Sequence, residues 1–212
     1  MAGTPSSQTV ESLGEKIERM IKQLPEHDVT LLEIIDIVGN DGLLLLTVLL
    51  SLIFLVPVSI PGVSTVFGSA ILLIGITRLL SRKLWLPAKI GHRRLPAAKL
   101  AAGFEKALSW FHRLEKISKP HRLGFFAESA LFNLLNNIAL ILAAVLLMMP
   151  FGLIPFSNTF PAVAVIFLAI GMMQRDGGSV LLGHLANVAT IAYFTALALG
   201  GVAAAGMAVG GG

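Results

Sequence analysis

Residues 43–80 read LLLLTVLLSLIFLVPVSIPGVSTVFGSAILLIGITRLL, and the break inside this apolar stretch decides the fold. The break contains Pro57, Pro61 and Gly62 and leaves arms of 14 and 15 residues on its two sides. At 1.5 Å per residue each arm is about 21–23 Å long, which is shorter than the ~30 Å hydrocarbon core of a bilayer. We therefore expect a re-entrant hairpin or a broken helix. Two plain spanning helices, extended at their ends, are the alternative.

The same arrangement recurs in the second half of the chain. An apolar run over 131–149 is broken by Pro150 and Pro155, and a second run over 160–173 follows. The matching pairs lie 94 to 96 residues apart: Ile60-Pro61 with Ile154-Pro155, Ser64-Thr65 with Asn158-Thr159, and Ile74-Gly75 with Ile170-Gly171. Chance similarity explains the apolar letters, but it explains two proline pairs less easily. We predict two similar broken-helix units of roughly eighty residues each.

The composition points to a membrane as the main solvent. Hydrophobic residues make up 55% of the chain, charged residues 13%, and the mean hydropathy is +0.83, which is far from the balance of a soluble domain. The chain has no cysteine, so thiolate metal sites are excluded. Its five histidines lack the i, i+3 or i+4 spacing of a helical metal site. We therefore expect no metal, no cofactor and no soluble enzyme.

The first 41 residues are acidic and amphipathic, with three Lys/Arg against eight Asp/Glu. Apolar residues recur at three- and four-residue spacing through residues 10–24, which predicts a helix that ends or kinks at Pro25. Thr30 and Glu33 have capping-box spacing, so a second short helix is predicted over 30–38. Gly39-Asn40-Asp41-Gly42 then predicts a turn.

A basic connector joins the two units. Residues 78–122 carry twelve of the sixteen Lys/Arg and only two acidic residues. With Trp85 and Trp110, this charge is typical of a helix that lies on anionic lipid, and we predict one over 97–117. The positive-inside rule places the connector in the cytoplasm, with the N-terminus on the same side if the first unit is a hairpin. Nucleic-acid binding is the weaker explanation of the charge.

The last apolar segment, residues 180–209, is long enough to span a membrane. Ala196, Gly200, Ala204 and Ala208 recur at four-residue steps, a pattern that allows close helix contact. The contact is either packing within one chain, which we favour, or a homodimer.

We therefore predict an all-α integral membrane protein with Pro-broken or re-entrant helices. Its expected parts are cytoplasmic amphipathic helices (1–41), a first broken-helix hairpin (42–80), the basic connector (81–122), a second broken-helix hairpin (123–177) and a Gly/Ala-rich transmembrane helix (178–212).

Polar side chains at the two breaks form the predicted site. A broken helix frees backbone N–H and C=O groups that hydrocarbon does not satisfy, and such breaks build mid-membrane sites in several transporters. The alternative is that these side chains merely cap the freed helix ends. The predicted site comprises Ser59, Ser64, Thr65, Ser157, Asn158 and Thr159.

Ionisable residues near the apolar runs are few. Glu128, Asp176 and Arg175 flank the second unit, and His184 lies early in the last segment. A proton-coupled carrier would use one of them, with Glu128 as the first choice, whereas residues that simply face water are the alternative. An intramembrane enzyme would need Arg175 beside one of the two carboxylates. The three asparagines of the second unit, Asn133, Asn136 and Asn137, are expected to form hydrogen bonds inside the bundle.

The chain resembles the ExoD-type exopolysaccharide synthesis family of bacterial inner-membrane proteins. The resemblance rests on Pro61-Gly62-Val-Ser64-Thr65-Val-Phe-Gly68, on Trp85-Leu-Pro87, and on Pro155-Phe-Ser-Asn158 leading to Gly171 and Arg175-Asp176-Gly177. It covers most of residues 31–193. The chain departs from it at Ser157, where glycine is expected. The resemblance implies a role in exopolysaccharide production, but the family label describes a process and no reaction.

Two hypotheses about function follow. The first is a multi-pass inner-membrane transporter, or a lipid- or ion-handling protein, with a polar site between two repeats. The second is a membrane scaffold or regulatory subunit that binds the exopolysaccharide synthesis proteins. Membrane lipid is the expected partner in both, and we expect no catalysis because the residues supply no catalytic arrangement.

Overall fold

The computed structural model describes residues 13–23, 27–55, 62–80, 94–95, 105, 129–149 and 154–210. The described part is helical apart from a two-residue ladder. The elements are α1 (Leu13–Gln23), β1 (Val29–Thr30), α2 (Leu31–Leu52), the 3-10 helix η1 (Ile53–Leu55), α3 (Val63–Leu79), β2 (Arg94–Leu95), α7 (Ala130–Leu147), α8 (Thr159–Gln174) and α9 (Gly177–Gly210).

The N-terminal helices form as their sequence predicts. Helix α1 ends two residues before Pro25, and the predicted capping box starts α2. The Glu33 amide donates to the Thr30 hydroxyl at 3.3 Å, and the Thr30 amide donates to a Glu33 carboxylate oxygen at 2.8 Å. β1 pairs with β2 in antiparallel register, with Thr30 opposite Arg94, a contact that the sequence did not predict. The connector is thereby tied to the start of α2.

The predicted turn at residues 39–42 is a kink at one residue. Gly39 has φ +60° and ψ −159°, and the helix resumes directly after it, so that α2 continues to Leu52. A left-handed φ costs glycine little, which explains why the kink falls at this position. The short predicted helix and the first arm of the apolar stretch are thus two parts of one kinked element.

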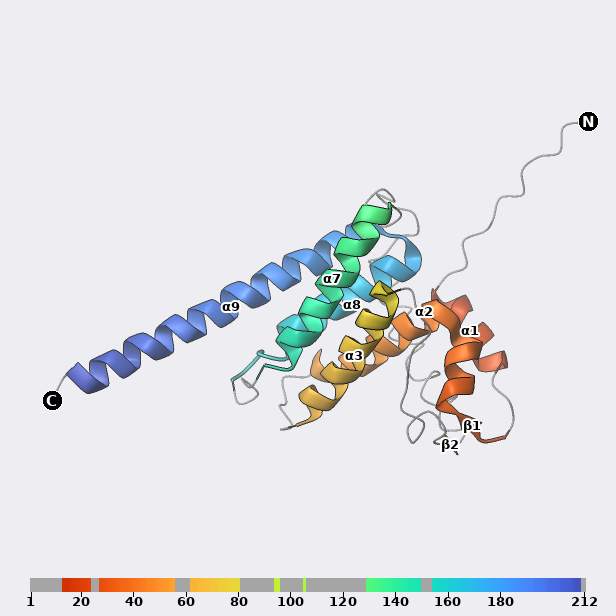
Figure 1. Ribbon diagram of the computed structural model, residues 1–212, viewed down its shortest axis with the longest axis horizontal. Helices are drawn as coiled ribbons and strands as arrows, with labels where there is room; N and C mark the ends of the chain where they lie inside the picture. The colour runs from red at the N-terminus through yellow and green to blue at the C-terminus, as the bar shows by residue number, and fades with distance from the viewer. Residues whose placement is uncertain are drawn as a thin grey trace, which may run out of the picture.

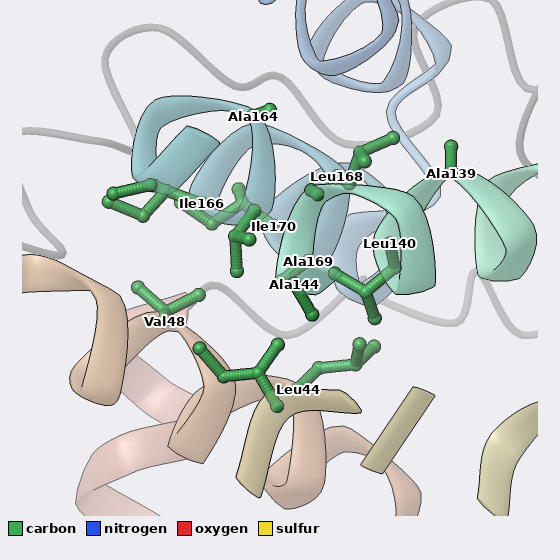
Figure 2. Packing of buried hydrophobic residues seen from close by; sticks show 14 of the residues in the cluster. Leu44, Val48, Ala139, Leu140, Ala144, Ala164, Ile166, Leu168, Ala169 and Ile170 are labelled. Carbon is green, nitrogen blue, oxygen red and sulfur yellow. The ribbon is translucent and has the colours of Figure 1, made fainter. Parts of the chain in front are cut away.

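Each helix beside the first break packs mainly on a helix beside the second break, and not on its neighbour in sequence. α2 packs mainly on α8, and α3 packs mainly on α7, whereas α2 and α3 contact each other less. α7 also packs on α8, and α9 lies along α8 (Figure 1). Figure 2 shows the shared core, where α2, α7 and α8 meet. Its labelled side chains are Leu44 and Val48 from α2, Ala139, Leu140 and Ala144 from α7, and Ala164, Ile166, Leu168, Ala169 and Ile170 from α8.

Glycines allow the closest helix contacts. A Cβ on Gly75 of α3 would meet Ile141 of α7 at 2.8 Å. A Cβ on Gly171 of α8 would meet the backbone amide of Val180 in α9 at 2.6 Å, and one on Gly183 of α9 would meet Leu168 of α8 at 2.6 Å. Close approach through small residues is typical of helix packing in membranes, where lipid is as apolar as the side chains.

Two helices are long and apolar enough to cross a membrane, namely α7 and residues 177–201 of α9. Helices α3, α8 and residues 41–55 are apolar but shorter. Of the most apolar 18-residue window, 44% is buried inside the protein in α7 and 28% in α9, so more than half of each window lies at the surface. Their exposed apolar side chains are Leu131, Leu134, Leu135, Ile138, Leu142 and Val145 on α7, and Leu181, Leu182, Leu185, Val188, Ile191 and Leu199 on α9. Apolar surface of this extent indicates a lipid-facing protein.

Candidate functional site

The helix ends that flank the two breaks meet at one end of the bundle. The Phe54 ring, after α2, lies edge-on to Phe67 of α3 with centroids 6.0 Å apart. The Thr159 hydroxyl, at the start of α8, donates to the Phe54 carbonyl at 2.9 Å. A Cβ on Gly68 of α3 would meet Met148 at the end of α7. We call this region, defined by the helix ends at Phe54, Gly62, Met148 and Thr159, the break end.

The two breaks share a backbone geometry at matching positions. Gly62 and Phe156 lie 94 residues apart, each directly after an Ile-Pro pair, and both are left-handed, with φ +85° and +65°. The carbonyl of each accepts the amide of the residue four positions on, Val66 or Phe160, at 3.1 Å in both cases. The left-handed residue of the second break is therefore Phe156, and not its neighbour Ser157, where the resemblance expects glycine.

The predicted polar residues do not all come together. Ser64 and Ser157 are buried, whereas Thr65 is exposed. Thr159 acts as a cap, because its hydroxyl satisfies the Phe54 carbonyl at the end of η1. Ser59 lies outside the described residues, as do three of the five predicted helix-break residues, Pro57, Pro61 and Pro150.

Asn158 is the polar residue of this group that capping does not explain. The residue is 7% exposed, and its Oδ1 is buried without a hydrogen-bond partner among the described residues. Its side chain forms no hydrogen bond that caps the start of α8. A buried amide acceptor left unpaired costs about 1–3 kcal/mol, so this oxygen is suited to bind a hydrogen-bond donor or a cation that enters from outside the chain.

An aromatic cluster holds the second break against α9. The Tyr193 hydroxyl donates to the Pro155 carbonyl at 2.7 Å. The Tyr193 ring lies 5.2 Å from that of Phe160, which is 6.4 Å from that of Phe156. Sequence reasoning missed this contact, although Tyr193 is the single tyrosine of the chain. Because Tyr193 lies in the middle of α9, the break end sits beside the midpoint of the longest helix.

Asp176 and Arg175 form the corner between α8 and α9. Asp176 is fully buried, and its carboxylate oxygens accept the Gly178 amide at 2.9 Å and the Ser179 hydroxyl at 2.7 Å, as an N-cap does. Arg175 is exposed and left-handed, with φ +55°, and ends α8. The first-choice ionisable residue, Glu128, lies outside the described residues.

A charged network joins α3 to α7 at the opposite end of the bundle. Arg78 donates its Nε–H to Asn137 Oδ1 at 3.3 Å, and Asn137 Nδ2 donates to the carbonyl and side-chain oxygens of Asn133 at 2.7 Å. Asp41 lies close enough for its carboxylate to attract the Arg78 guanidinium. The expected hydrogen bonding by asparagine inside the bundle is thus present, with Arg78 as a partner that the sequence did not indicate.

A second polar network joins α7 to α9, and we call the contact that contains it the seam between these helices. His184 Nε2 lies 2.9 Å from Asn136 Oδ1, and Asn187 Nδ2 donates to the Ala139 carbonyl at 2.9 Å. Asn136 is fully buried and Asn187 is 3% exposed. Asn187 Oδ1 is buried without a partner among the described residues. Within the same residues, no group of three or more His, Cys, Asp or Glu is placed to hold a metal ion.

Comparisons with known proteins identify the family. The family model described as "Exopolysaccharide synthesis, ExoD" matches residues 13–196. Protein ExoD of Rhizobium meliloti is 43% identical over 193 residues, which cover 91% of this chain and 80% of that protein. An uncharacterized protein of Synechocystis sp. is 34% identical over 131 residues, which cover 61% of this chain and 60% of that protein. No solved structure matches the chain. The chain therefore belongs to the ExoD family of exopolysaccharide synthesis.

Proposed function

We propose that this chain is a protein of the bacterial inner membrane that supports exopolysaccharide production by moving or binding a small polar solute, an ion or a lipid headgroup at the break end. Family membership supports the role in exopolysaccharide synthesis. The proposed activity is binding and transport without covalent chemistry. The observation that carries it is Asn158 Oδ1, a buried acceptor without a partner among the described residues, placed where both units meet.

The depth of the break end supports a re-entrant arrangement. Tyr193, which binds Pro155, is the seventeenth of the 34 residues of α9. At 1.5 Å per residue α9 is about 50 Å long, whereas the 16 residues of α8 measure about 24 Å. If the middle of α9 lies at the bilayer mid-plane, the two hairpins enter from one side and turn near that plane. Irregular backbone is tolerated at this depth only inside protein or beside a cavity.

The two units fit a parallel repeat. Gly62 and Phe156 share their conformation and their hydrogen bond. The helices pair in an exchanged manner, α2 with α8 and α3 with α7. Both breaks lie at the same end, so the axis that relates the units would run along the membrane normal. The charge of the basic connector supports a cytoplasmic position for the opposite end of the bundle, which includes Arg78, by the positive-inside rule.

Asn158→Leu tests the proposed site. In a host that lacks its own ExoD-family protein, this variant is expected to insert normally but to lose the support of exopolysaccharide output. Thr195→Val is the matched control, because Thr195 is exposed and its hydroxyl bonds only within α9, to the Ile191 carbonyl. Normal output from Asn158→Leu at equal membrane content would contradict the proposal.

Thiol labelling tests whether water reaches the site. The chain has no native cysteine, so a single cysteine at Asn158 reports on this position alone. A site that takes up a solute must open to water, and the cysteine is expected to react with a membrane-impermeant reagent. A cysteine that stays unreactive from both sides of the membrane would mean a dry, packed break.

A scaffold is the second candidate, and α9 is the observation that favours it. Figure 1 shows α9 extending past the other helices, and its exposed Leu199, Gly200 and Gly201 lie in this half. A Cβ on either glycine would meet nothing within 4 Å. If this half binds a partner of the synthesis machinery, removal of residues 202–212 abolishes exopolysaccharide output while Asn158→Leu leaves it intact. The transport hypothesis predicts the larger loss from Asn158→Leu.

A further inference from the structure

The seam between α7 and α9 contains one strongly polar, titratable side chain in an otherwise uncharged region. Helices α7, α8 and α9 contain no Asp, Glu, Lys or Arg within their bounds. His184 is half-buried among them. An ionisable side chain inside an apolar bundle is costly, so its presence points to a function. Histidine is also the side chain whose ordinary titration lies between about pH 5 and 8.

Hydrogen bonding defines one nitrogen of His184. Asn136 presents Oδ1, an acceptor, at 2.9 Å from Nε2. The tautomer that forms a hydrogen bond to this oxygen carries its hydrogen on Nε2, and Nδ1 of the neutral ring is then left with a lone pair. A proton that arrives at His184 binds this lone pair and creates a second N–H donor, which then requires an acceptor of its own.

Within the described part of the chain, Asn187 has an unpartnered acceptor one helical turn from His184. Its Nδ2 donates to the Ala139 carbonyl, and because a carbonyl accepts but cannot donate, the amide must turn its NH2 group to Ala139. Oδ1 is thereby directed elsewhere, and it is buried without a partner among the described residues. Asn187 follows His184 by three residues, so the two side chains share a face of α9, one turn apart.

We propose that His184, Asn136 and Asn187 form a proton-binding site in the seam between α7 and α9. In the neutral state Nε2–H bonds to Asn136 Oδ1. In the protonated state this bond remains, and Nδ1–H bonds to Asn187 Oδ1, directly or through one water. Asn187 Oδ1 is thus the acceptor that serves only the protonated form of His184.

Among the described residues, few other titratable groups lie on the helices that form the seam. α8 and α7, which pack on α9, contribute no titratable side chain to the seam. On α9 and its corner the nearest are Tyr193, Asp176 and Arg175, and Asp176 is occupied as an N-cap. Arg78 and Asp41 belong to the separate network through Asn137. The site is also distinct from the break end, where Tyr193 and Asn158 lie.

The test is 15N NMR of histidine-labelled full-length chain in nanodiscs, with His184 assigned by the signal missing from His184→Gln. We expect His184 to carry its hydrogen on Nε2 at high pH and to take up a second proton, reversibly, as the pH falls. A His184 signal that stays neutral down to pH 4.5, or that carries its hydrogen on Nδ1, would overturn the proposal.

Two variants of one residue move the titration in opposite directions. Asn187→Leu removes the acceptor of the charged form, so proton affinity falls by about tenfold or more and the titration moves to lower pH. Asn187→Asp adds a negative acceptor and moves it to higher pH. Thr195→Val, on the exposed face of α9, is the control and leaves the titration unchanged. Equal titration in all three variants would overturn the role of Asn187. Asn158→Leu is expected to titrate normally, so this result is independent of the break-end site.

Discussion

At the scale of single residues, Phe156 combines an aromatic side chain with a backbone conformation that favours glycine. Its φ of +65° matches the +85° of Gly62 at the equivalent position of the first break. For a residue with a Cβ, the left-handed region costs roughly 1–2 kcal/mol. The residue is 52% exposed, so full burial of its side chain does not offset this cost. The second break therefore keeps a strained aromatic residue at the position where the first break has glycine.

Replacing Phe156 by glycine and by alanine isolates this strain. Both variants lose the same ring and the same contact with Phe160, and they differ only in the Cβ at a positive φ. We expect Phe156→Gly to be the more stable by about 1 kcal/mol, the reverse of the usual order in helices. Thermal unfolding in detergent measures the difference. An alanine variant that melts at or above the glycine variant would show that Phe156 is not strained.

Some features of single residues were readable from the sequence and others were not. The alignment of Ile60-Pro61 with Ile154-Pro155 already paired Gly62 with Phe156, so the left-handed residue was within reach. The unpaired oxygens of Asn158 and Asn187 were not, because an amide pattern does not reveal which acceptors remain unpaired after packing. Thr159 was predicted as either a site or a cap, and its bond to the Phe54 carbonyl favours the cap.

At the scale of elements, α8 and α9 form the most extensive helix pair among the described residues, and Gly171 is one of the two glycines, with Gly183, that set their approach. A Cβ on Gly171 would meet the Val180 amide at 2.6 Å and the Asp176 carbonyl at 3.0 Å, both in the backbone at the corner that starts α9. Backbone atoms in a packed corner cannot swing aside as a flexible side chain does. The position therefore tolerates no side chain without a shift of α9 itself.

Gly171→Ala is expected to destabilise the protein by about 3 kcal/mol, through overpacking and displacement of α9. Gly200→Ala is the control on the other side of the pair, since a Cβ there meets nothing within 4 Å. It is expected to be neutral or to stabilise α9 by up to about 1 kcal/mol, because alanine is the better helix former. Melting temperatures of the two variants in one detergent provide the comparison. Equal effects would mean that the close approach of α8 and α9 contributes little.

Most element boundaries followed from local rules, whereas the pairing of the elements did not. Pro25, the Thr30–Glu33 capping box and the apolar periodicity located α1 and the start of α2. The kink at Gly39 replaced a predicted turn, because one left-handed glycine suffices to redirect a helix. The β1–β2 ladder and the exchange of helix partners depend on contacts distant in sequence, which periodicity does not encode.

At the scale of the whole molecule, both breaks lie at the same end of the bundle, and cysteine labelling from the two sides of the membrane tests this arrangement. Single cysteines at Thr65 and Phe156, both exposed beside the breaks, are expected to share one pattern of labelling by an impermeant reagent. Cysteines at Leu80 and Arg175, both exposed at the opposite end, are expected to share the other pattern and to react from the cytoplasm. In an inverted repeat Thr65 would group with Arg175 instead.

The exchange of partners between the hairpins also orders the assembly of the protein. A ribosome releases α2 and α3 well before α7 and α8 exist, since chains grow by roughly 5–20 residues per second. The main packing surfaces of α2 and α3 belong to those later helices, so Gly68, Gly75 and the other contact positions of the first two helices stay uncovered until α7 and α8 are made. The helix bundle is thus completed only when the second half of the chain arrives, and a chain that stalls within the connector leaves α2 and α3 without their packing partners.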